Sequence, residues 1–314
     1  MQDDDIPFRQ EPHDARHVPP TGNGSSTGEQ NTFMADLAKE LIAAGMELYG
    51  RLTSDDDAVD AFGFDPELVD ESIMPLLRPL YEKYFRIETE GLENIPADGG
   101  ALVVANHSGT LPVDALMLQV AIRDHHSDER RLRMLAADLA FAYPVIRDLA
   151  RKLGHVRACP ENALDLLQEG ALVGVMPEGY RGLGKPYEDR YRLQRFGRGG
   201  FAAAALRTGR PMVPCSIVGA EEIYPMVGES RTLARKLGLP YFPITPTFPL
   251  FGALGLLPLP TKWTIRFDPP VYTDGFPPDA ADDSKVVEKL AGEVKDTIQH
   301  RLNEMRVGRE SPFF

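Results

Sequence analysis

Short apolar runs alternate with helical patterns along most of this chain, and no other feature of the sequence constrains the fold as strongly. The runs have the length of single buried strands. Runs that predict strands occupy residues 101–106, 131–137, 155–158, 171–176, 212–219 and 262–270. Patterns that predict helices occupy residues 112–122, 144–152, 160–168, 200–208 and 284–306. This alternation at short spacing predicts an α/β fold with a mainly parallel central sheet flanked by helices.

The N-terminal part has a different texture. Residues 1–31 are rich in Asp, Pro, Gly and Ser, so we expect a disordered tail there. Residues 32–86 predict a helical extension, with a helical pattern over 33–49 and a second helix that begins at 65–66, where Asp precedes Pro. These helices either pack on the core or face a membrane. Residues 87–314 then form a single α/β domain.

Composition excludes some classes of function. The formal net charge is −13 at pH 7. Nucleic acid is therefore not an expected partner, because phosphate contacts need clustered Lys and Arg. Two cysteines favour a reducing compartment. The acidic N-terminus does not resemble a signal peptide, and no stretch approaches the ~20 apolar residues of a membrane-spanning helix.

One region breaks the alternation of strands and helices. Residues 237–260 contain six prolines and almost no charge. Prolines at this density prevent a regular helix. An exposed apolar surface of this size usually marks an interface. The segment is therefore either a loop buried on its own domain or a loop that dips into a membrane or lines an acyl chain.

The first motif that carries chemistry is NHSGTLPVD, residues 106–114, which directly follows a predicted strand. Open α/β sheets bind ligands at the carboxyl ends of their strands, where His107 is expected. The Asp114 carboxylate can hold the imidazole in one tautomer and leave the other nitrogen free to take a proton. For the pair taken alone, ordinary hydrogen bonding within a loop is the favoured interpretation, and a general base is the alternative.

The second motif is PEGYR, residues 177–181, which follows the strand predicted at 171–176. Glu178 and Arg181 bring a carboxylate and a cation to the same sheet edge as His107. Further basic residues follow at Lys185, Arg190, Arg192, Arg195 and Arg198. In an acidic chain this local excess of cations indicates a ligand with phosphate groups, or else a solvated loop.

Taken in order, NHSGTLPVD, PEGYR and MVPCSIVG resemble the motifs of the lysophospholipid/glycerolipid acyltransferase superfamily, and the resemblance extends over about residues 92–270. Within that superfamily, the sequence is similar to the 1-acylglycerol-3-phosphate O-acyltransferases. The resemblance implies that His107 is the catalytic base and Asp114 its orienting partner. It implies substrate binding by Asn106, Ser108, Gly109, Arg157, Glu178, Gly179, Arg181, Lys185 and Pro214. Backbone N–H groups of residues 108–110 are candidates for the oxyanion donors.

The sequence departs from the family pattern at two places. Six residues separate His107 from Asp114 where four are usual, because Pro112 stands at the usual aspartate position. This longer loop resembles the branch of mono- and diacylglycerol acyltransferases. In addition, Pro160 stands where the family often has an arginine that holds the acceptor phosphate, and Arg157 is the candidate replacement. The choice between a phosphorylated and a neutral acceptor therefore stays open.

The resemblance implies transfer of a fatty acyl group from acyl-CoA or an acyl carrier protein thioester to the hydroxyl of 1-acylglycerol 3-phosphate, in phospholipid biosynthesis. The alternatives are a mono- or diacylglycerol acyltransferase and a lipid-binding protein without turnover. No bound cofactor and no metal are implied. The expected partners are acyl-CoA, a glycerolipid acceptor and a membrane surface. We expect a peripheral protein on the cytoplasmic face of the cell membrane.

Overall fold

The computed structural model describes residues 59–108, 111–307, 309 and 311–313, with isolated helical positions at 39, 43, 45, 46 and 50. The chain divides into two compact units, Met1–Glu47 and Leu48–Phe314, and the α/β fold lies in the second. The predicted tail over 1–31 and most of the helix predicted over 33–49 lie outside the described residues.

A seven-stranded sheet forms the centre of the fold, in the order β1-β9-β6-β2-β5-β3-β4. Its strands are β1 Glu88–Glu90, β2 Ala101–Ala105, β3 Leu132–Ala136, β4 Val156–Arg157, β5 Leu172–Val175, β6 Met212–Val218 and β9 Thr264–Phe267. All neighbouring pairs are parallel except β6 and β9. The predicted mainly parallel sheet is therefore confirmed. A separate two-stranded sheet joins β7 Gly228–Glu229 to β8 Pro243–Ile244.

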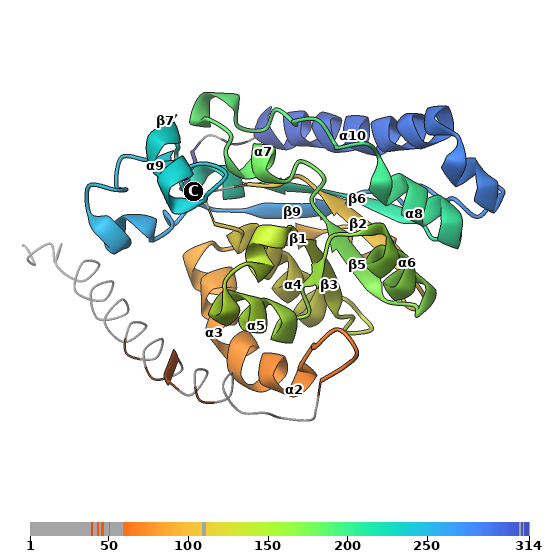
Figure 1. Cartoon of the computed structure of the whole chain (residues 1–314), viewed down its shortest axis with the longest axis horizontal. Coiled ribbons are helices and arrows are strands. Elements are labelled where there is room, and N and C mark those ends of the chain that lie inside the picture. Colours follow the sequence, from red (N-terminus) through yellow and green to blue (C-terminus); the bar gives the residue numbers. More distant parts are fainter. Residues whose placement is uncertain are drawn as a thin grey trace, which may run out of the picture. The chain divides into compact units, whose positions relative to one another are not determined.

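Helices cover both faces of the sheet (Figure 1). They are α3 Met74–Pro79, α4 Val113–His125, α5 Pro144–Lys152, α6 Pro160–Gln168, α8 Gly200–Thr208 and α10 Ser284–Val307. Alternate residues of β2 face opposite layers: Val103 packs with α3 and α4, and Val104 packs with α6, α8 and α10. Every residue of β2 is buried, as expected for a parallel strand covered on both sides.

Shorter elements connect these layers. They are α7 Tyr180–Leu183, α9 Arg231–Leu237, and the 3-10 turns η3 Leu92–Asn94, η4 Asp138–Phe141, η5 Tyr187–Asp189, η6 Ala220–Glu222, η7 Gly252–Leu256 and η8 Pro278–Asp282. Within the described part of the chain, none of the helices has the length and apolar composition to cross a bilayer.

The predicted helix at 65–66 begins where expected. The Asp65 side chain accepts a hydrogen bond from the Leu68 N–H at 2.8 Å, with proline at the first helical position. Helical structure then continues as α2 Pro66–Leu68, the π-turn η1 Val69–Ile73, α3, and the π-turn η2 Leu80–Tyr84. Met74 and Tyr81 are buried in the core, so this part of the extension packs on the α/β domain.

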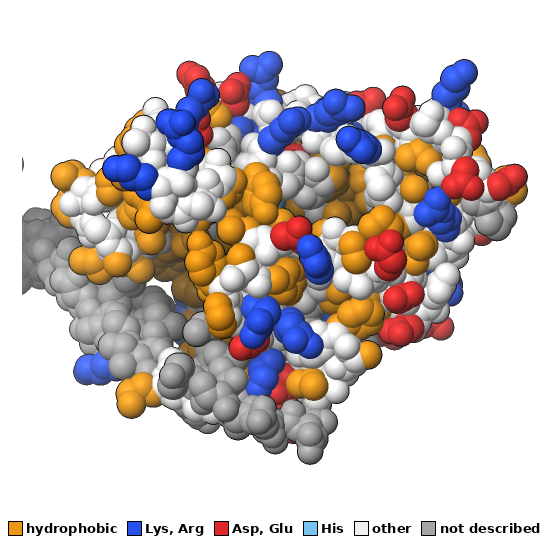
Figure 2. All heavy atoms as spheres, viewed as in Figure 1, with side chains coloured by type: hydrophobic (Ala, Val, Ile, Leu, Met, Phe, Trp, Pro, Cys, Tyr) orange, Lys and Arg blue, Asp and Glu red, His pale blue; other side chains and the backbone are white. Residues whose placement is uncertain are grey.

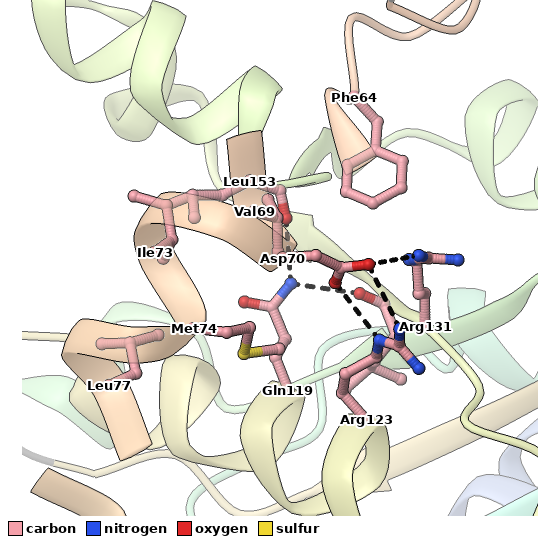
Figure 3. A pocket seen from close by; sticks show the side chains of 11 residues that line it. Phe64, Val69, Asp70, Ile73, Met74, Leu77, Gln119, Arg123, Arg131 and Leu153 are labelled. Atoms are coloured by element: carbon pink, nitrogen blue, oxygen red, sulfur yellow. Dashed lines mark hydrogen bonds and ion pairs between the residues drawn. The ribbon is translucent and has the colours of Figure 1, made fainter. Parts of the chain in front are cut away.

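A cavity of about 20 Å³ lies between this helical segment and α4 (Figure 3). At its edge, Asp70 forms ion pairs with Arg123 of α4 at 3.1 Å and with Arg131 at 2.5 Å. These ion pairs tie the helical segment to the domain beside the apolar contacts of the core.

The topology places a switch point at the carboxyl ends of β2 and β5. The two strands are parallel neighbours. The chain leaves β2 through α4, which packs on one face of the sheet, and leaves β5 towards α8, which packs on the other. Adjacent strands whose connections leave on opposite faces mark the switch point at which open α/β sheets bind ligands. His107 and Glu178 follow β2 and β5, and the sequence therefore predicts both at this point.

Candidate active site

Asn106 ends β2 and frees the chain to turn. Its side-chain amide donates to the Ile217 carbonyl of β6 at 3.0 Å and accepts from the Ile217 N–H at 2.7 Å. The side-chain amide thus makes the two hydrogen bonds that a backbone peptide group of β2 would make to β6. Because the N–H and carbonyl of Ile217 keep their partners, the main chain of the next residue can leave the sheet. This presents His107 at the strand end.

His107 and Asp114 form the predicted pair. The imidazole Nδ1 lies 2.8 Å from Asp114 Oδ2, and the Asp114 side chain is completely buried at the start of α4. The same carboxylate accepts from the Ser108 N–H at 2.8 Å, the Ser108 hydroxyl at 3.0 Å and the Ala115 N–H at 2.9 Å. The spacing of six intervening residues therefore allows direct contact.

This contact assigns the tautomer of His107. A carboxylate that already accepts from other donors requires the proton on Nδ1, so Nε2 carries the lone pair. Nε2 has no hydrogen-bond partner within the described part of the chain, and the side chain is 11% exposed. The arrangement can remove a proton from a hydroxyl and stabilise the resulting imidazolium.

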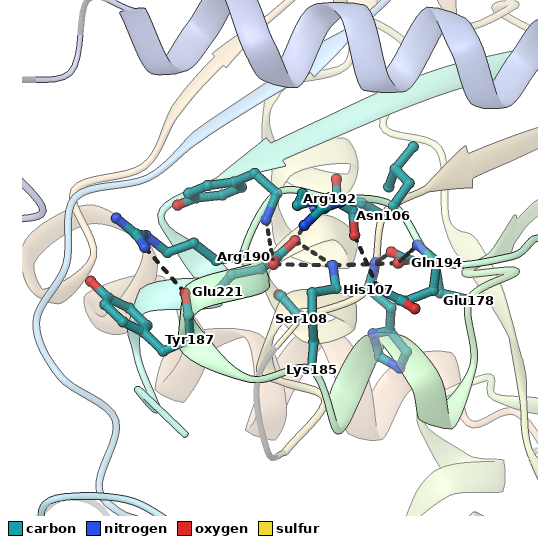
Figure 4. A network of polar contacts seen from close by, with 12 residues as sticks. Asn106, His107, Ser108, Glu178, Lys185, Tyr187, Arg190, Arg192, Gln194 and Glu221 are labelled. Carbon is teal, nitrogen blue, oxygen red and sulfur yellow. Dashed lines mark hydrogen bonds and ion pairs between the residues drawn. The ribbon is translucent and has the colours of Figure 1, made fainter. Parts of the chain in front are cut away.

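Glu178 positions the main chain of His107. It is 4% exposed and follows β5. Its Oε1 accepts from the His107 N–H at 3.0 Å and its Oε2 accepts from the Gln194 N–H at 2.6 Å (Figure 4). The carboxylate therefore joins the loop after β2 to the loop that leads to α8. Its predicted role in binding substrate stays a prediction, since both oxygens already have protein partners.

The Lys185 ammonium group bridges two carboxylates, one of which is that of Glu178. Its Nζ is 3.3 Å from Glu178 and 3.1 Å from both oxygens of Glu221, and its side chain is 3% exposed. Lys185 was predicted to bind substrate, but its ammonium group is buried and faces these two side chains. The structure therefore gives it a role in holding the site together.

Glu221 was missed from the sequence. Burial raises its pKa to about 7, against the opposing attraction of Lys185. Its Oε2 accepts from the Tyr191 N–H at 2.7 Å, and its Oε1 lies 3.4 Å from the Asn106 amide nitrogen. One ammonium therefore faces two buried carboxylates, and the network leads back to the residue that ends β2. The Glu-Glu pair after β6 gave no motif that could have marked it.

Two glycines of the PEGYR segment have steric reasons to be glycine. Gly179 adopts φ +54° and ψ −139°, a conformation that side chains with a Cβ rarely adopt. A Cβ added at Gly182 would lie 2.9 Å from the Cβ atoms of both His107 and Glu178. Gly182 thus allows α7 to pack against the base. The sequence contains no signal that separates Gly182 from the glycines of ordinary turns.

Tyr241 brings the proline-rich segment to the site. A Cβ added at Gly184 would lie 3.2 Å from the Tyr241 ring, which places the ring against the end of α7. Burial, together with the nearby charge of Asp114, raises the pKa of the Tyr241 phenol. Sequence separation hid this residue, because the site motifs end well before position 241.

The basic residues of the second motif differ in their surroundings. Arg181, Arg195 and Arg198 are exposed, and their guanidinium groups have no partner in the described part of the chain. Arg192 pairs with Asp189 at 3.1 Å, and Arg190 stacks over Tyr187 at 4.3 Å. Three cations therefore remain for an anionic ligand, and their contact with phosphate stays a prediction.

Two other predicted residues lie away from His107. Arg157 is exposed on β4, and its Nε lies 2.5 Å from Asp138. Strands β5 and β3 separate β4 from β2, a distance of about 14 Å at the usual strand spacing. Pro214 is buried within β6, opposite Val104 of β2. The roles predicted for both in substrate binding remain predictions.

The oxyanion donors proposed from the sequence are partly corrected. Ser108 donates its N–H to Asp114, so this group is not free to bind an oxyanion and that expectation was wrong. Ser108 itself is fully buried, with its hydroxyl also on Asp114. Gly109 and the next residue lie outside the described residues. Among the residues that the structure describes, no three His, Cys, Asp or Glu side chains gather as metal ligands.

Comparison with known proteins agrees with this geometry. The family model described as Acyltransferase matches residues 86–218, which contain both motifs. An uncharacterized protein of Mycobacterium tuberculosis is 53% identical over 291 residues, which cover 93% of this chain and 81% of that protein. The chain belongs to the glycerolipid acyltransferase superfamily. As an acyltransferase, it carries the predicted base and carboxylate in direct contact.

More distant relatives of this acyltransferase have named activities. A chloroplastic 1-acyl-sn-glycerol-3-phosphate acyltransferase of Arabidopsis thaliana is 29% identical over 157 residues, 46% of this chain and 40% of that protein. An enzyme of Bos taurus described as synthesizing storage lipids independently of DGAT1/2 is 27% identical over 215 residues, 68% of this chain and 58% of that protein.

A solved structure shares the fold of the acyltransferase. The crystal structure of the 1-acyl-sn-glycerophosphate acyltransferase PlsC from Thermotoga maritima aligns with a TM-score of 0.51 at 19% identity. The alignment covers 90% of this chain and 99% of that chain. This likeness extends the agreement from the motif region to the sheet and its helices.

Proposed function

We propose that this acyltransferase moves a fatty acyl group from a thioester, carried by coenzyme A or an acyl carrier protein, to the free hydroxyl of 1-acylglycerol 3-phosphate. The observation that carries the proposal is the His107–Asp114 pair at 2.8 Å, with Nε2 left as the proton acceptor. The reaction would form a phospholipid precursor, and neither substrate would need to be hydrolysed.

Each step follows from the chemistry of this pair. His107 Nε2 takes the hydroxyl proton as the acceptor oxygen bonds to the thioester carbonyl carbon. Asp114 holds Nδ1–H and stabilises the imidazolium. The tetrahedral intermediate then collapses, the C–S bond breaks, and the leaving thiolate takes the proton from Nε2. No acyl-enzyme forms, because the acceptor attacks the donor directly.

The unpaired cations favour a phosphorylated acceptor. Arg181 lies on α7 beside Gly182, whose Cα approaches His107. Its exposed guanidinium could hold a phosphate by two parallel hydrogen bonds. The Arabidopsis relative is named for the same acceptor. The membrane surface that contains such lipids is the proposed place of action, on its cytoplasmic face.

A neutral acceptor is the second candidate. Arg157, the possible replacement for the motif arginine, pairs with Asp138 at the sheet edge. The storage-lipid enzyme of Bos taurus shows similarity over more of this chain than the Arabidopsis protein does. Mono- or diacylglycerol would need no phosphate ligand, and the proton transfer at His107 would be the same.

A product assay tests the reaction and the acceptor together. Purified full-length protein is incubated with labelled acyl-CoA and a panel of phosphorylated and neutral acceptors, and products are resolved by mass spectrometry. We expect His107→Ala to lower the rate by about 10²–10⁴-fold. His300→Ala is the control, since that histidine is 74% exposed on α10. Substantial turnover by His107→Ala would disprove the mechanism, and products from neutral acceptors alone would favour the second candidate.

A further inference from the structure

An exposed apolar surface lies on the segment from residue 227, just before β7, to the residues after η7. It carries Val227, Leu233, Leu237, Ile244, Leu250, Phe251, Leu254 and Leu257. The last four are 77%, 61%, 72% and 59% exposed, and we call them the apolar tip. Figure 2 shows hydrophobic side chains gathered on the lobe at the left of the view, where Figure 1 places α9. Contiguous exposed patches of this kind mark interaction sites.

The apolar tip is held on a defined scaffold. The Thr247 hydroxyl donates to the Gly255 carbonyl at 3.0 Å, and the Tyr224 hydroxyl donates to the Leu256 carbonyl at 2.8 Å. A Cβ added at Gly255 would lie 2.3 Å from the Thr247 carbonyl oxygen, so the backbone is closely packed there. The side chains of the apolar tip therefore project from a turn whose backbone is fixed by hydrogen bonds and close packing.

The charge of the same segment indicates an anionic partner. The chain has a formal net charge of −13, yet after Glu229, which pairs with Arg231 at 2.9 Å, residues 230–262 contain basic residues and no Asp or Glu. Arg235 and Lys236 are exposed on α9, without ion-pair partners in the described part of the chain. Apolar side chains next to unpaired cations match a bilayer with anionic headgroups, where the former insert and the latter contact phosphate.

The segment also reaches the catalytic pair. Tyr241 lies between α9 and the apolar tip in sequence, and its ring packs on Gly184 near Asp114. We propose that the apolar tip inserts into the interface of a bilayer that contains anionic phospholipids, with Arg235 and Lys236 against the headgroups. The inference rests on the proposed function, because docking there brings the catalytic pair to the membrane that holds the acceptor.

Vesicle flotation of the full-length protein tests this inference. Vesicles of phosphatidylcholine are compared with vesicles that also contain phosphatidylglycerol. We expect the double variant Phe251→Glu/Leu254→Glu to lower the partition coefficient at least about tenfold, because two inserted side chains become charged. Tyr272→Glu is the matched control, since Tyr272 is 65% exposed outside the segment, and it should bind as the wild type does.

Charge reversal on α9 provides a second variant. Arg235→Glu/Lys236→Glu should lower binding to vesicles with phosphatidylglycerol by about fivefold or more for each residue. Binding to pure phosphatidylcholine should change much less. Equal losses on both kinds of vesicle would overturn the assignment of these cations to anionic headgroups.

Two results would overturn docking by the apolar tip. One is unchanged flotation of Phe251→Glu/Leu254→Glu. The other is a change in its oligomeric state, measured by light scattering after gel filtration, with vesicle binding intact, which would make the tip a contact between copies of this chain. The flotation assay contains no acyl donor. Bound protein that yields no product with any acceptor would therefore refute the proposed function and leave the docking surface standing.

Discussion

Two charge clusters in this fold have opposite composition. In one, the Asp70 carboxylate lies between Arg123 and Arg131 at 3.1 and 2.5 Å (Figure 3). In the other, the Lys185 ammonium lies between Glu178 and Glu221 at 3.3 and 3.1 Å (Figure 4). Each centres on three ionisable groups, two of one sign and one of the other, and Arg123 of the first also pairs with Glu129 at 2.8 Å. The contacts alone would suggest similar contributions to the fold.

Access to water separates the two clusters. Side chains of the Asp70 cluster are 17–41% exposed, whereas those of the Lys185 cluster are 0–5% exposed. Burial opposes the charge of Asp70, but hydrogen bonds from its arginines outweigh it and lower the pKa of the carboxyl. Burial raises the pKa of Glu221 to about 7 despite Lys185. Burial therefore decides whether hydrogen bonds from cationic partners lower the pKa of a carboxyl or fail to offset the cost of its charge.

The clusters also differ in what they hold. The surface cluster joins the helical segment over 66–84 to α4, where apolar contacts already bind the two. The buried cluster reaches the N–H of His107 through Glu178. Loss of the first should affect stability a little, and loss of the second should affect both stability and the position of the base.

Removal of the buried cation should have the largest effect. Lys185→Met would leave two buried carboxylates without their ammonium partner, and we expect a loss of about 3–5 kcal/mol in the free energy of unfolding. Urea denaturation at pH 8 measures the change. Arg131→Met is the matched control from the surface cluster and should cost less than about 1 kcal/mol. Similar losses for both variants would remove the distinction between the clusters.

Neutralisation of the positioning carboxylate should follow in size. In Glu178→Gln, one oxygen can still accept from the His107 N–H, but the amide nitrogen then faces the Gln194 N–H and the loop must shift. We expect kcat to fall by up to about a hundredfold, because small misplacements of a catalytic group are costly, while KM changes less. Steady-state kinetics measures both constants.

Exposed Glu288→Gln on α10 is the control for that experiment. A fall in kcat that is accompanied by a large loss in the free energy of unfolding would assign Glu178 to general support of the fold. An unchanged kcat would show that the base keeps its place without this carboxylate.

The strands and helices could largely be predicted from the sequence. Helices α5 and α6 have the predicted bounds, because each begins at a proline whose fixed φ suits the first helical position. Strand β1 was missed, because its residues Glu-Thr-Glu present no apolar run and pair only with β9 at the sheet edge. A local sequence pattern predicts a helix or a strand only when the residues of that element themselves favour it.

The site could be predicted only where one segment contains the chemistry. His107 lies in the loop after β2 and Asp114 in the first turn of α4, only seven positions apart, and their contact is confirmed by the structure. Glu221, Gly182 and Tyr241 belong to the site through packing between distant segments, and no short pattern encodes that packing. The burial of Lys185 was missed for the same reason: its neighbours Glu178 and Glu221 meet it only after β5 and β6 join the sheet.

The two clusters should respond to pH with opposite signs. The pKa of Glu221 is raised from 4.5 to about 7, so between these values the folded protein keeps a proton that the unfolded chain has lost. Stability should therefore fall by about 2 kcal/mol as pH rises from about 4.5 to 7. In Glu221→Gln this component of the pH dependence should disappear. Urea denaturation of both proteins over that range measures it, and parallel curves would contradict the buried assignment.

Asp70→Asn should have the smallest effect. Because the pKa of Asp70 is lowered below its ordinary value of 3.8, its contribution is present at neutral pH and is lost only as pH falls through that range. Its partners are partly exposed, so solvent screens the pairs and we expect about 0.5–1 kcal/mol at pH 7. High salt should remove much of the difference from the wild type. A loss comparable to that of Lys185→Met, or one insensitive to salt, would mean that the surface cluster is not screened, and exposure would no longer explain why the two clusters differ.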